Sequence, residues 1–89
     1  MYEIVYTRKF LRDFKKHAKS GVHFRENLNK VIELLGSRSP LGDTYKDHKL
    51  NGTRKGYREC HILFDLLLVY KYHDTWVELV TLDTHEALF

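Results

Sequence analysis

The first part of the chain combines one β-like segment with two amphipathic helical segments. Residues 3–7 are rich in Ile, Val and Tyr, which is typical of a strand. After Thr7, a favoured helix N-cap residue, apolar side chains recur at helical spacing until Gly21, and the spacing returns until Gly36. The apolar positions are Phe10, Leu11, Phe14 and Ala18, then Phe24, Leu28, Val31, Ile32 and Leu35. Because only a tight turn separates them, the helices should form an antiparallel hairpin.

The second part of the chain is mostly β-like. Residues 37–55 show no sustained period, and so long a loop in a small domain is more often functional than idle. Three strand-like segments follow at residues 56–62, 66–72 and 75–82. The middle one opens with a continuous apolar run, which predicts a central strand covered on both faces. The order β-α-α-β-β-β predicts an α+β fold, with a helical hairpin packed on one face of a mainly antiparallel sheet.

Size and composition predict one globular domain spanning residues 1–89. Hydrophobic residues make up 43% of the 89 residues, which is enough for a core and argues against disorder. The single cysteine, Cys60, excludes an internal disulfide framework and fits a reducing compartment. The longest apolar run, residues 66–70, is too short to span a bilayer. We therefore expect a soluble, cytoplasmic protein.

Charge is unevenly distributed, although the net charge is only +3. The basic residues of the helical region are Arg8, Lys9, Arg12, Lys15, Lys16, Lys19, Arg25 and Lys30. Asp13 and Glu26 are the acidic residues in the same region. This asymmetry favours a polyanion or an acidic protein as partner, with Lys15, Lys16 and Lys19 as RNA-binding candidates. A solvated helix face would explain the same charge run.

The second half also contains residues suited to proton transfer. Three histidines, His48, His61 and His85, occur there together with Asp65. Strand parity places Glu59 and His61 on one face of their strand, while Arg58, Cys60 and Ile62 point to the other. The apolar members of the second group should face the helices, which leaves Glu59 and His61 on an open face.

Such residues could cleave RNA without a metal. That reaction needs a base for the 2′-hydroxyl, an acid for the departing 5′-oxygen, and cations around the phosphorane-like transition state. Histidine can supply the first two near neutral pH, although isolated histidines are usually surface or packing residues. Compact metal-binding spacings such as His-x₃-His are absent from the sequence, so we expect neither metal nor cofactor. A buried Cys60 would be a poor nucleophile. Solvent exposure would account for His17, His23 and His73.

Several distinctive blocks follow one another between Tyr45 and Phe89. They are Tyr-Lys-Asp-His, Leu-Asn-Gly, Lys-Gly-Tyr-Arg-Glu-Cys-His, Asp65 with the nearby Leu-Leu-Val-Tyr, and Thr-His-Glu-Ala-Leu-Phe. In order and spacing this segment resembles the YafQ branch of the RelE-type bacterial toxins. Length and element order extend the resemblance over the whole chain. These toxins are ribosome-dependent mRNA endonucleases that a cognate antitoxin neutralises.

The resemblance implies roles for individual residues. It implies a catalytic set of His48, His61, Asp65 and His85, and a substrate-binding set of Lys46, Glu59, Arg58 and Phe89. Parity, however, points Arg58 away from His61. The chain also departs from the His-x-x-Pro-Asp-Trp pattern of the branch, with Phe64 and Leu66 around Asp65, and Arg54 replaces a tryptophan. The missing proline could change how Asp65 is presented.

The function that the resemblance implies is cleavage of mRNA in the ribosomal A site, leaving a 2′,3′-cyclic phosphate. The implied partners are the ribosome, mRNA and an acidic antitoxin of the DinJ or RelB kind, with operator DNA bound only by the toxin–antitoxin complex. Two alternatives remain open. One is a non-catalytic module of the same fold that binds an antitoxin and assists operator or RNA binding. The other is a basic RNA-binding protein that uses its helices and none of the histidines.

Overall fold

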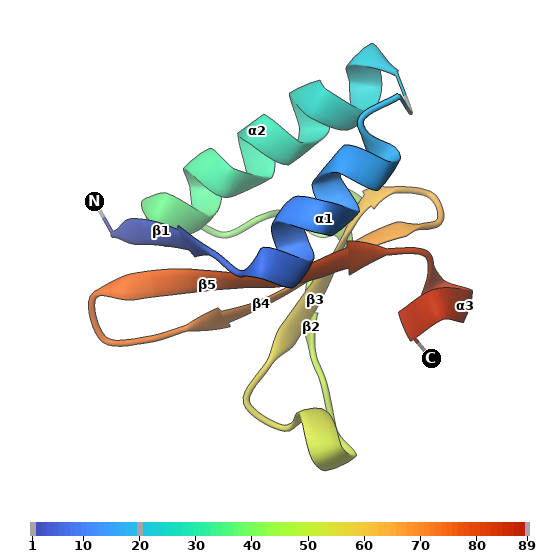
Figure 1. Ribbon diagram of the computed structural model, residues 1–89. Coiled ribbons are helices and arrows are strands. Elements are labelled where there is room, and N and C mark those ends of the chain that lie inside the picture. Colours follow the sequence, from blue (N-terminus) through green and yellow to red (C-terminus); the bar gives the residue numbers. More distant parts are fainter. Residues whose placement is uncertain (1, 20, 89) are drawn as a thin grey trace.

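A computed structural model describes residues 2–19 and 21–88 and shows an α+β fold (Figure 1). Its elements are β1 (Glu3–Tyr6), α1 (Arg8–His17), α2 (Val22–Gly36), η1 (Asp43–Tyr45), β2 (His48–Lys49), η2 (Gly52–Arg54), β3 (Arg58–Leu63), β4 (Leu66–Tyr72), β5 (Trp76–Asp83) and α3 (His85–Leu88). The strands form one sheet in the order β1-β5-β4-β3-β2, in which only β1 and β5 pair in parallel. The predicted fold class and mainly antiparallel sheet are confirmed.

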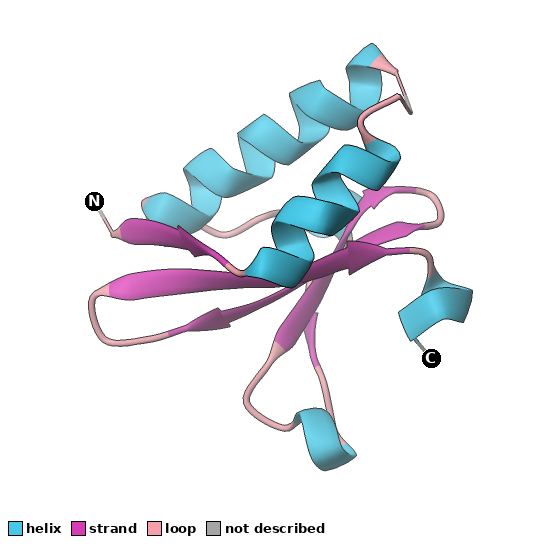
Figure 2. Ribbon diagram, in the orientation of Figure 1, coloured by secondary structure: helices cyan, strands magenta, loops and turns pink. Residues whose placement is uncertain are grey.

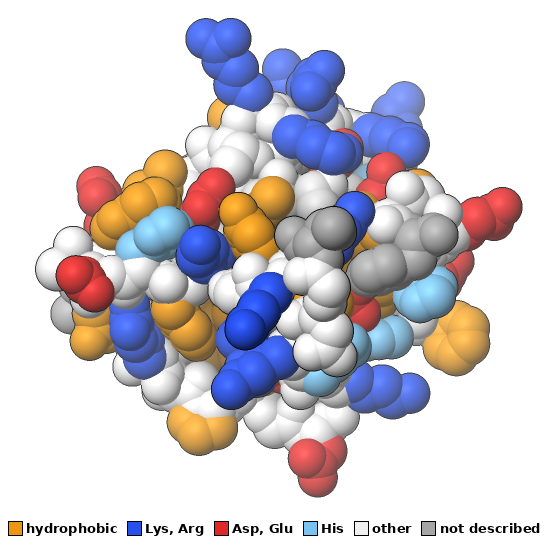
Figure 3. All heavy atoms as spheres, turned by 90° about the horizontal axis from the view of Figure 1, so that it is seen from below, with side chains coloured by type: hydrophobic (Ala, Val, Ile, Leu, Met, Phe, Trp, Pro, Cys, Tyr) orange, Lys and Arg blue, Asp and Glu red, His pale blue; other side chains and the backbone are white. Residues whose placement is uncertain are grey.

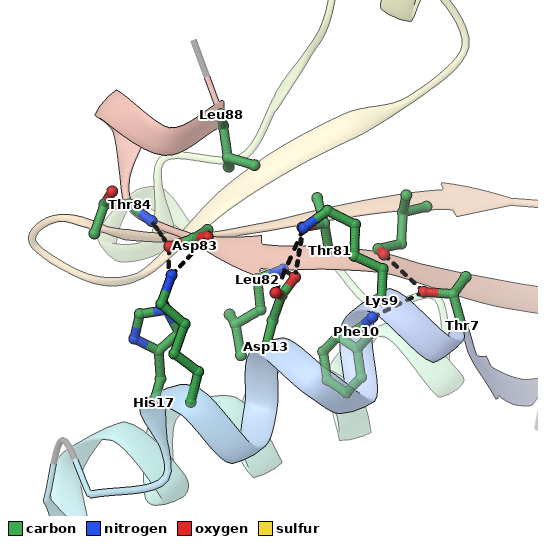
Figure 4. Close-up of polar contacts among 12 residues, drawn as sticks. Thr7, Lys9, Phe10, Asp13, His17, Thr81, Leu82, Asp83, Thr84 and Leu88 are labelled. Atoms are coloured by element: carbon green, nitrogen blue, oxygen red, sulfur yellow. Dashed lines mark hydrogen bonds and ion pairs between the residues drawn. The ribbon is translucent and has the colours of Figure 1, made fainter.

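Helix α1 begins at the predicted N-cap. The Thr7 side chain accepts a hydrogen bond of 3.0 Å from the Phe10 N–H, and its hydroxyl donates to the Val80 carbonyl at 2.7 Å (Figure 4). Thr7 therefore caps the helix and also ties its start to β5. Phe10 is buried as expected, whereas Leu11 is 48% exposed. The buried face of α1 is thus narrower than its apolar positions suggested.

The two helices form the predicted hairpin, but their boundaries differ from the expectation. Helix α1 ends at His17, before Gly21, and Gly21 instead occupies the N-cap position of α2 with φ of 108°. This left-handed backbone conformation favours glycine. Gly36 is the last residue of α2, and the cap position after it is occupied by Ser37. The apolar face of α2 is buried through Phe24, Leu28, Val31 and Leu35.

Helices α1 and α2 cover one face of the sheet (Figure 2). Strand β4 contributes to both faces, which confirms its predicted central position. Leu68 and Tyr70 join the main core beneath the helices, while Leu67 and Val69 belong to a smaller apolar cluster with Leu50 and Leu88. The continuous apolar run is explained by this double burial.

Asp13 fastens α1 to β5 through buried polar contacts (Figure 4). Its carboxylate accepts hydrogen bonds from the Thr81 hydroxyl at 2.7 Å and from the Leu82 N–H at 3.1 Å, and Lys9 lies 3.1 Å away. Burial opposes ionisation of Asp13, but these hydrogen bonds outweigh it and hold the pKa below its usual value.

The long segment between α2 and β3 is more ordered than the sequence indicated. It contains two short 3₁₀ helices and β2, which pairs with β3 so that His48 lies opposite Glu59. This pairing places His48, predicted to lie in a loop, on the sheet.

No helix in residues 2–19 and 21–88 is long and apolar enough to cross a membrane.

Candidate active site

The candidate site lies on the face of the sheet opposite α1 and α2. Figure 3 shows histidine side chains gathered on this face, near lysine and arginine side chains. The small cluster of Leu50, Leu67, Val69 and Leu88, with Tyr57 and Val80 packed against it, forms an apolar floor. The face was expected to be open. It is partly covered instead, because Leu50 comes from the segment between β2 and η2, and Leu88 from α3.

His48 is held between two oxygen atoms. Its Nε2 lies 3.3 Å from Glu59 Oε1, and its Nδ1 lies 2.9 Å from the carbonyl oxygen of Lys46. Lys46 has φ of 49°, a left-handed conformation that turns the chain just before His48. Because a carbonyl can only accept a hydrogen bond, Nδ1 carries a proton.

Glu59 is not on an open surface as predicted, since only 2% of it is exposed. The β2 strand and the His48 ring lie against it, and this pairing could not be anticipated from the parity of one strand. Within the described part of the chain, Glu59 Oε2 is buried without a hydrogen-bond partner. An unpaired buried carboxylate oxygen is destabilising, and such costs are concentrated at functional sites.

His61 and Asp65 are placed by the β3–β4 hairpin. His61 lies two residues after Glu59 and shares its face, about 6.6 Å further along the strand. Its Nδ1 lies 3.3 Å from the Phe64 carbonyl oxygen. Asp65 Oδ1 accepts a hydrogen bond of 3.3 Å from the main-chain N–H of His85. The hairpin is therefore connected to the first residue of α3.

These contacts form two groups of the predicted site residues. His48 pairs with Glu59 between β2 and β3, and Asp65 meets His85 where the β3–β4 hairpin approaches α3. His61 lies on β3 and belongs to the same sheet face as the first group. Lys46 is exposed beside His48, whereas Phe89 lies outside the described residues.

Arg58 faces the helix side of the sheet, as parity predicted. Its Nη2 lies 2.6 Å from Asp47 Oδ2, and its Nε lies 3.3 Å from both Asp47 Oδ1 and the Tyr70 hydroxyl. The Tyr70 hydroxyl donates to Asp47 as well. The hydrogen bonds with Asp47 raise the pKa of Arg58, and burial raises the pKa of Tyr70. This network anchors the residue immediately before His48.

Nucleophilic catalysis by Cys60 is disfavoured. Cys60 is fully buried on the helix side, and burial raises the pKa of its thiol, so it is a poor nucleophile. Residues 2–19 and 21–88 contain no group of three or more His, Cys, Asp or Glu side chains placed to hold a metal ion. Of the predicted RNA-binding lysines, Lys15 and Lys16 are exposed on α1 and Lys19 is exposed just beyond its end. Lys16 Nζ also lies 3.4 Å from Asp83 Oδ2.

His17 and His73 are not simply solvent-exposed, as the sequence had suggested. The His17 side chain is 14% exposed, and its Nε2 lies 3.1 Å from Asp83 Oδ1, two residues before His85 (Figure 4). Burial opposes ionisation of Asp83, but hydrogen bonds from Thr84, His17 and Lys16 outweigh it and lower its pKa. His73 stacks on Trp76 with ring centroids 3.8 Å apart. Helical spacing could have revealed His17, since it follows Phe10 and Asp13 on one face.

Comparison with known proteins identifies the family. The family model for YafQ, the bacterial toxin of a type II toxin–antitoxin system, matches residues 2–89. The chain belongs to the YafQ toxin family. The mRNA interferase toxin YafQ of Escherichia coli K12 is 33% identical over 87 residues, which cover 98% of this chain and 95% of that protein. The resemblance inferred from the sequence blocks is therefore confirmed.

Solved structures of YafQ-type toxins share the whole fold. The toxin in the E. coli DinJ–YafQ complex is 34% identical, with a TM-score of 0.86 and coverage of 100% of this chain and 99% of that one. A copper-bound mutant toxin from Helicobacter pylori is 37% identical, with a TM-score of 0.94 and full coverage of both chains. The sheet and helical hairpin are thus those of RelE-like toxins.

Proposed function

We propose that this chain acts, as one toxin domain in the cytoplasm, as a ribosome-dependent endoribonuclease that cleaves mRNA in the A site. The observation that carries the proposal is the pair of imidazoles of His48 and His61 on one sheet face, with the Glu59 carboxylate at His48. The E. coli relative, an mRNA interferase, supports the same reaction class. Asp65 and His85 would complete the site from the adjoining hairpin and α3.

The hydrogen-bond pattern favours different roles for the histidines. His61 Nδ1 faces a carbonyl and therefore donates, which leaves Nε2 of the neutral ring free to accept the 2′-hydroxyl proton as general base. The 2′-oxygen attacks phosphorus, and the P–O5′ bond breaks to give a 2′,3′-cyclic phosphate and a 5′-hydroxyl. His85 would protonate the departing 5′-oxygen. His48, with oxygen acceptors at both ring nitrogens, would supply positive charge near the phosphorane-like transition state.

The cognate partner would be an acidic antitoxin. A groove of about 230 Å³ lies between α1 and α2, lined mainly by apolar residues that include Tyr6, Leu11 and Ile32. Basic residues of α1 flank these apolar side chains, which suits an acidic segment that orders upon binding. Occupying this surface would also block RNA binding by α1, which is one physical route to neutralisation. Operator DNA would be bound by the complex of the two proteins.

Mapping mRNA 5′ ends in a translating extract tests the proposed function. The wild-type chain should produce cuts in phase with ribosome position, and they should disappear when translation initiation is blocked. Cuts that persist on naked RNA would argue for a free nuclease. Antitoxin binding without any cuts would favour the non-catalytic module.

Single-turnover cleavage on saturating ribosomes tests the catalytic set. His61→Ala and His85→Ala should each lower the rate about 10²–10⁴-fold, as expected for a lost acid or base. Ribosome binding, measured by co-sedimentation, should be unchanged because α1 is intact. His23→Ala is the matched control, since the His23 side chain is 85% exposed on α2. Normal rates in the His61 and His85 variants would exclude this catalytic assignment.

A further inference from the structure

Phe64 stands out among the apolar residues because 95% of it is exposed. The other large exposed apolar residues, Tyr6, Leu11 and Val22, are about half exposed and lie on or beside the helices. A single exposed apolar side chain is ordinary. The position of Phe64 beside His61 and Asp65 is what requires an explanation.

The hairpin geometry keeps the Phe64 ring outside the core. Leu63 pairs with Leu66 across the hairpin, so Phe64 and Asp65 alone form the turn. Leu63 packs against the main core and Leu66 belongs to it, which fixes the strand ends on either side. The Phe64 carbonyl faces His61 Nδ1, and Asp65 accepts from the His85 N–H. The exposed ring is therefore carried by a backbone that is tied to the candidate catalytic residues.

Two cavities adjoin Phe64. One, of about 360 Å³, is lined by residues that include Asn27, Tyr45, Lys46 and His61. The other, of about 340 Å³, is lined by His17, Leu63, Asp65, Leu66 and Thr84, and Phe64 borders both. The first cavity combines an ammonium group, an imidazole and an amide with two aromatic rings. This is the chemistry of a nucleotide site, in which cations take the phosphate and an aromatic ring takes the base.

We propose that Phe64 is a stacking platform for an unpaired RNA base adjacent to the scissile phosphate. The proposal rests on the proposed function, because it places the reacting phosphate at His61. The base would lie on the phenyl ring, and Lys46 would contact the RNA backbone. Stacking on an aromatic side chain stabilises a bound base whatever its identity, because every base has a π-face. Because purines offer the larger stacking surface, the platform would favour a purine at this position.

Substitutions at Phe64 separate stacking from simple apolar contact. Phe64→Ala and Phe64→Leu should each lower kcat/KM for cleavage of ribosome-bound mRNA about tenfold, which corresponds to about 1.4 kcal/mol. Phe64→Trp should restore it, because the aromatic surface returns. Mapped cut sites should lose their purine preference in the Ala and Leu variants and regain it in the Trp variant. Thermal unfolding should change little, since the ring is exposed.

Val22→Ala is the matched control, because Val22 is a 54% exposed apolar residue on α2. It should leave kcat/KM and base preference unchanged. If wild type fails to cut ribosome-bound mRNA, the proposed function fails. If wild type cuts and Phe64→Leu cuts equally well with the same base preference, the stacking platform is overturned. Weaker antitoxin binding with normal cleavage in Phe64→Ala would overturn it too, and would assign Phe64 to a protein interface.

Discussion

At the scale of single residues, the least expected feature is the burial of Glu59. Its Oε1 faces the His48 ring, while its Oε2 is buried without a partner in the described chain. Residues that reduce stability are retained where activity depends on them. The pair with His48 is therefore better explained by the chemistry of the site than by the stability of β3.

Replacing Glu59 with glutamine should consequently separate activity from stability. Glu59→Gln removes the carboxylate that lies 3.3 Å from the His48 ring, so single-turnover cleavage should fall about 10–100-fold. The free energy of unfolding should stay unchanged or rise by about 1 kcal/mol, because a buried charge is removed. Urea denaturation and cleavage on saturating ribosomes measure the two quantities. A joint loss of stability and activity would show that Glu59 is mainly structural.

The sequence predicted which residues carry reactive groups better than how they meet. Parity along β3 correctly separated Glu59 and His61 from Cys60 and Arg58. The sequence pattern could not reveal that β2 pairs with β3, because β2 has only two residues and so shows no alternation of polar and apolar positions. The Arg58 contacts with Asp47 and Tyr70 depend on the same pairing and on β4. Long-range register therefore decides the details of this site.

At the scale of elements, the long periodic segments and the short strand β1 were predicted correctly, whereas β2, α3 and the two 3₁₀ helices were missed. The hairpin of α1 and α2 and the strands β3, β4 and β5 all follow from hydrophobic spacing. The four-residue helix α3 has too few residues to show a helical pattern. Its start is stabilised locally, because the hydroxyl of Thr84, the residue before α3, accepts a hydrogen bond from the Ala87 N–H. Its position is fixed by Leu88 in the small apolar cluster.

The Thr7 cap should contribute measurably to the stability of the α1–β5 contact. Thr7→Ala removes the acceptor for the Phe10 N–H and the donor to the Val80 carbonyl. We expect the free energy of unfolding to fall by about 1–2 kcal/mol, as for other N-cap deletions. Urea denaturation followed by circular dichroism would measure it. Thr75→Ala, at an exposed hairpin position, should change stability by less than about 0.5 kcal/mol. Equal effects would mean that Thr7 has no capping role.

At the scale of the whole molecule, two ionised aspartates attach α1 to β5. Asp13 and Asp83 both have lowered pKa values, because their hydrogen bonds outweigh the effect of burial. A carboxyl group with a lowered pKa in the folded state stabilises the protein above its unfolded pKa, about 3.9 for aspartate. That contribution is lost as pH falls through the lower folded value.

The protein should therefore lose stability progressively as pH falls from about 4. In Asp13→Asn, the free energy of unfolding should be lower near neutral pH and should change less between pH 6 and pH 2.5. Asp74→Asn, at an exposed position, should keep the wild-type acid dependence. Denaturant titrations across this pH range provide the comparison. An Asp13→Asn profile parallel to that of wild type would show that other carboxyl groups dominate acid unfolding.

The uneven charge of the molecule implies that ribosome binding and RNA cleavage depend on different surfaces. Lys15 is exposed on α1 and Lys19 just beyond its end, while His48 and His61 lie on the opposite face of the sheet. Lys16 also approaches Asp83, so its replacement would alter the α1–β5 contact as well as the surface charge. Phosphate contacts release counterions, and binding that uses them weakens with salt. Lys15 and Lys19 are therefore the cleaner pair for a binding test.

Replacing Lys15 and Lys19 together with alanine should weaken ribosome binding. It should also reduce the slope of log affinity against log salt concentration by up to about two. The single-turnover rate on saturating ribosomes should stay within about twofold of wild type, because no proton-transfer group has been removed. Lys16→Ala should weaken binding and also lower the free energy of unfolding by up to about 1 kcal/mol, as for an exposed ion pair. Affinity measured by co-sedimentation at several salt concentrations, beside the cleavage rate, distinguishes the two effects. A slope unchanged in the double variant would place the ribosome contact on another surface and leave the basic face of α1 to the antitoxin.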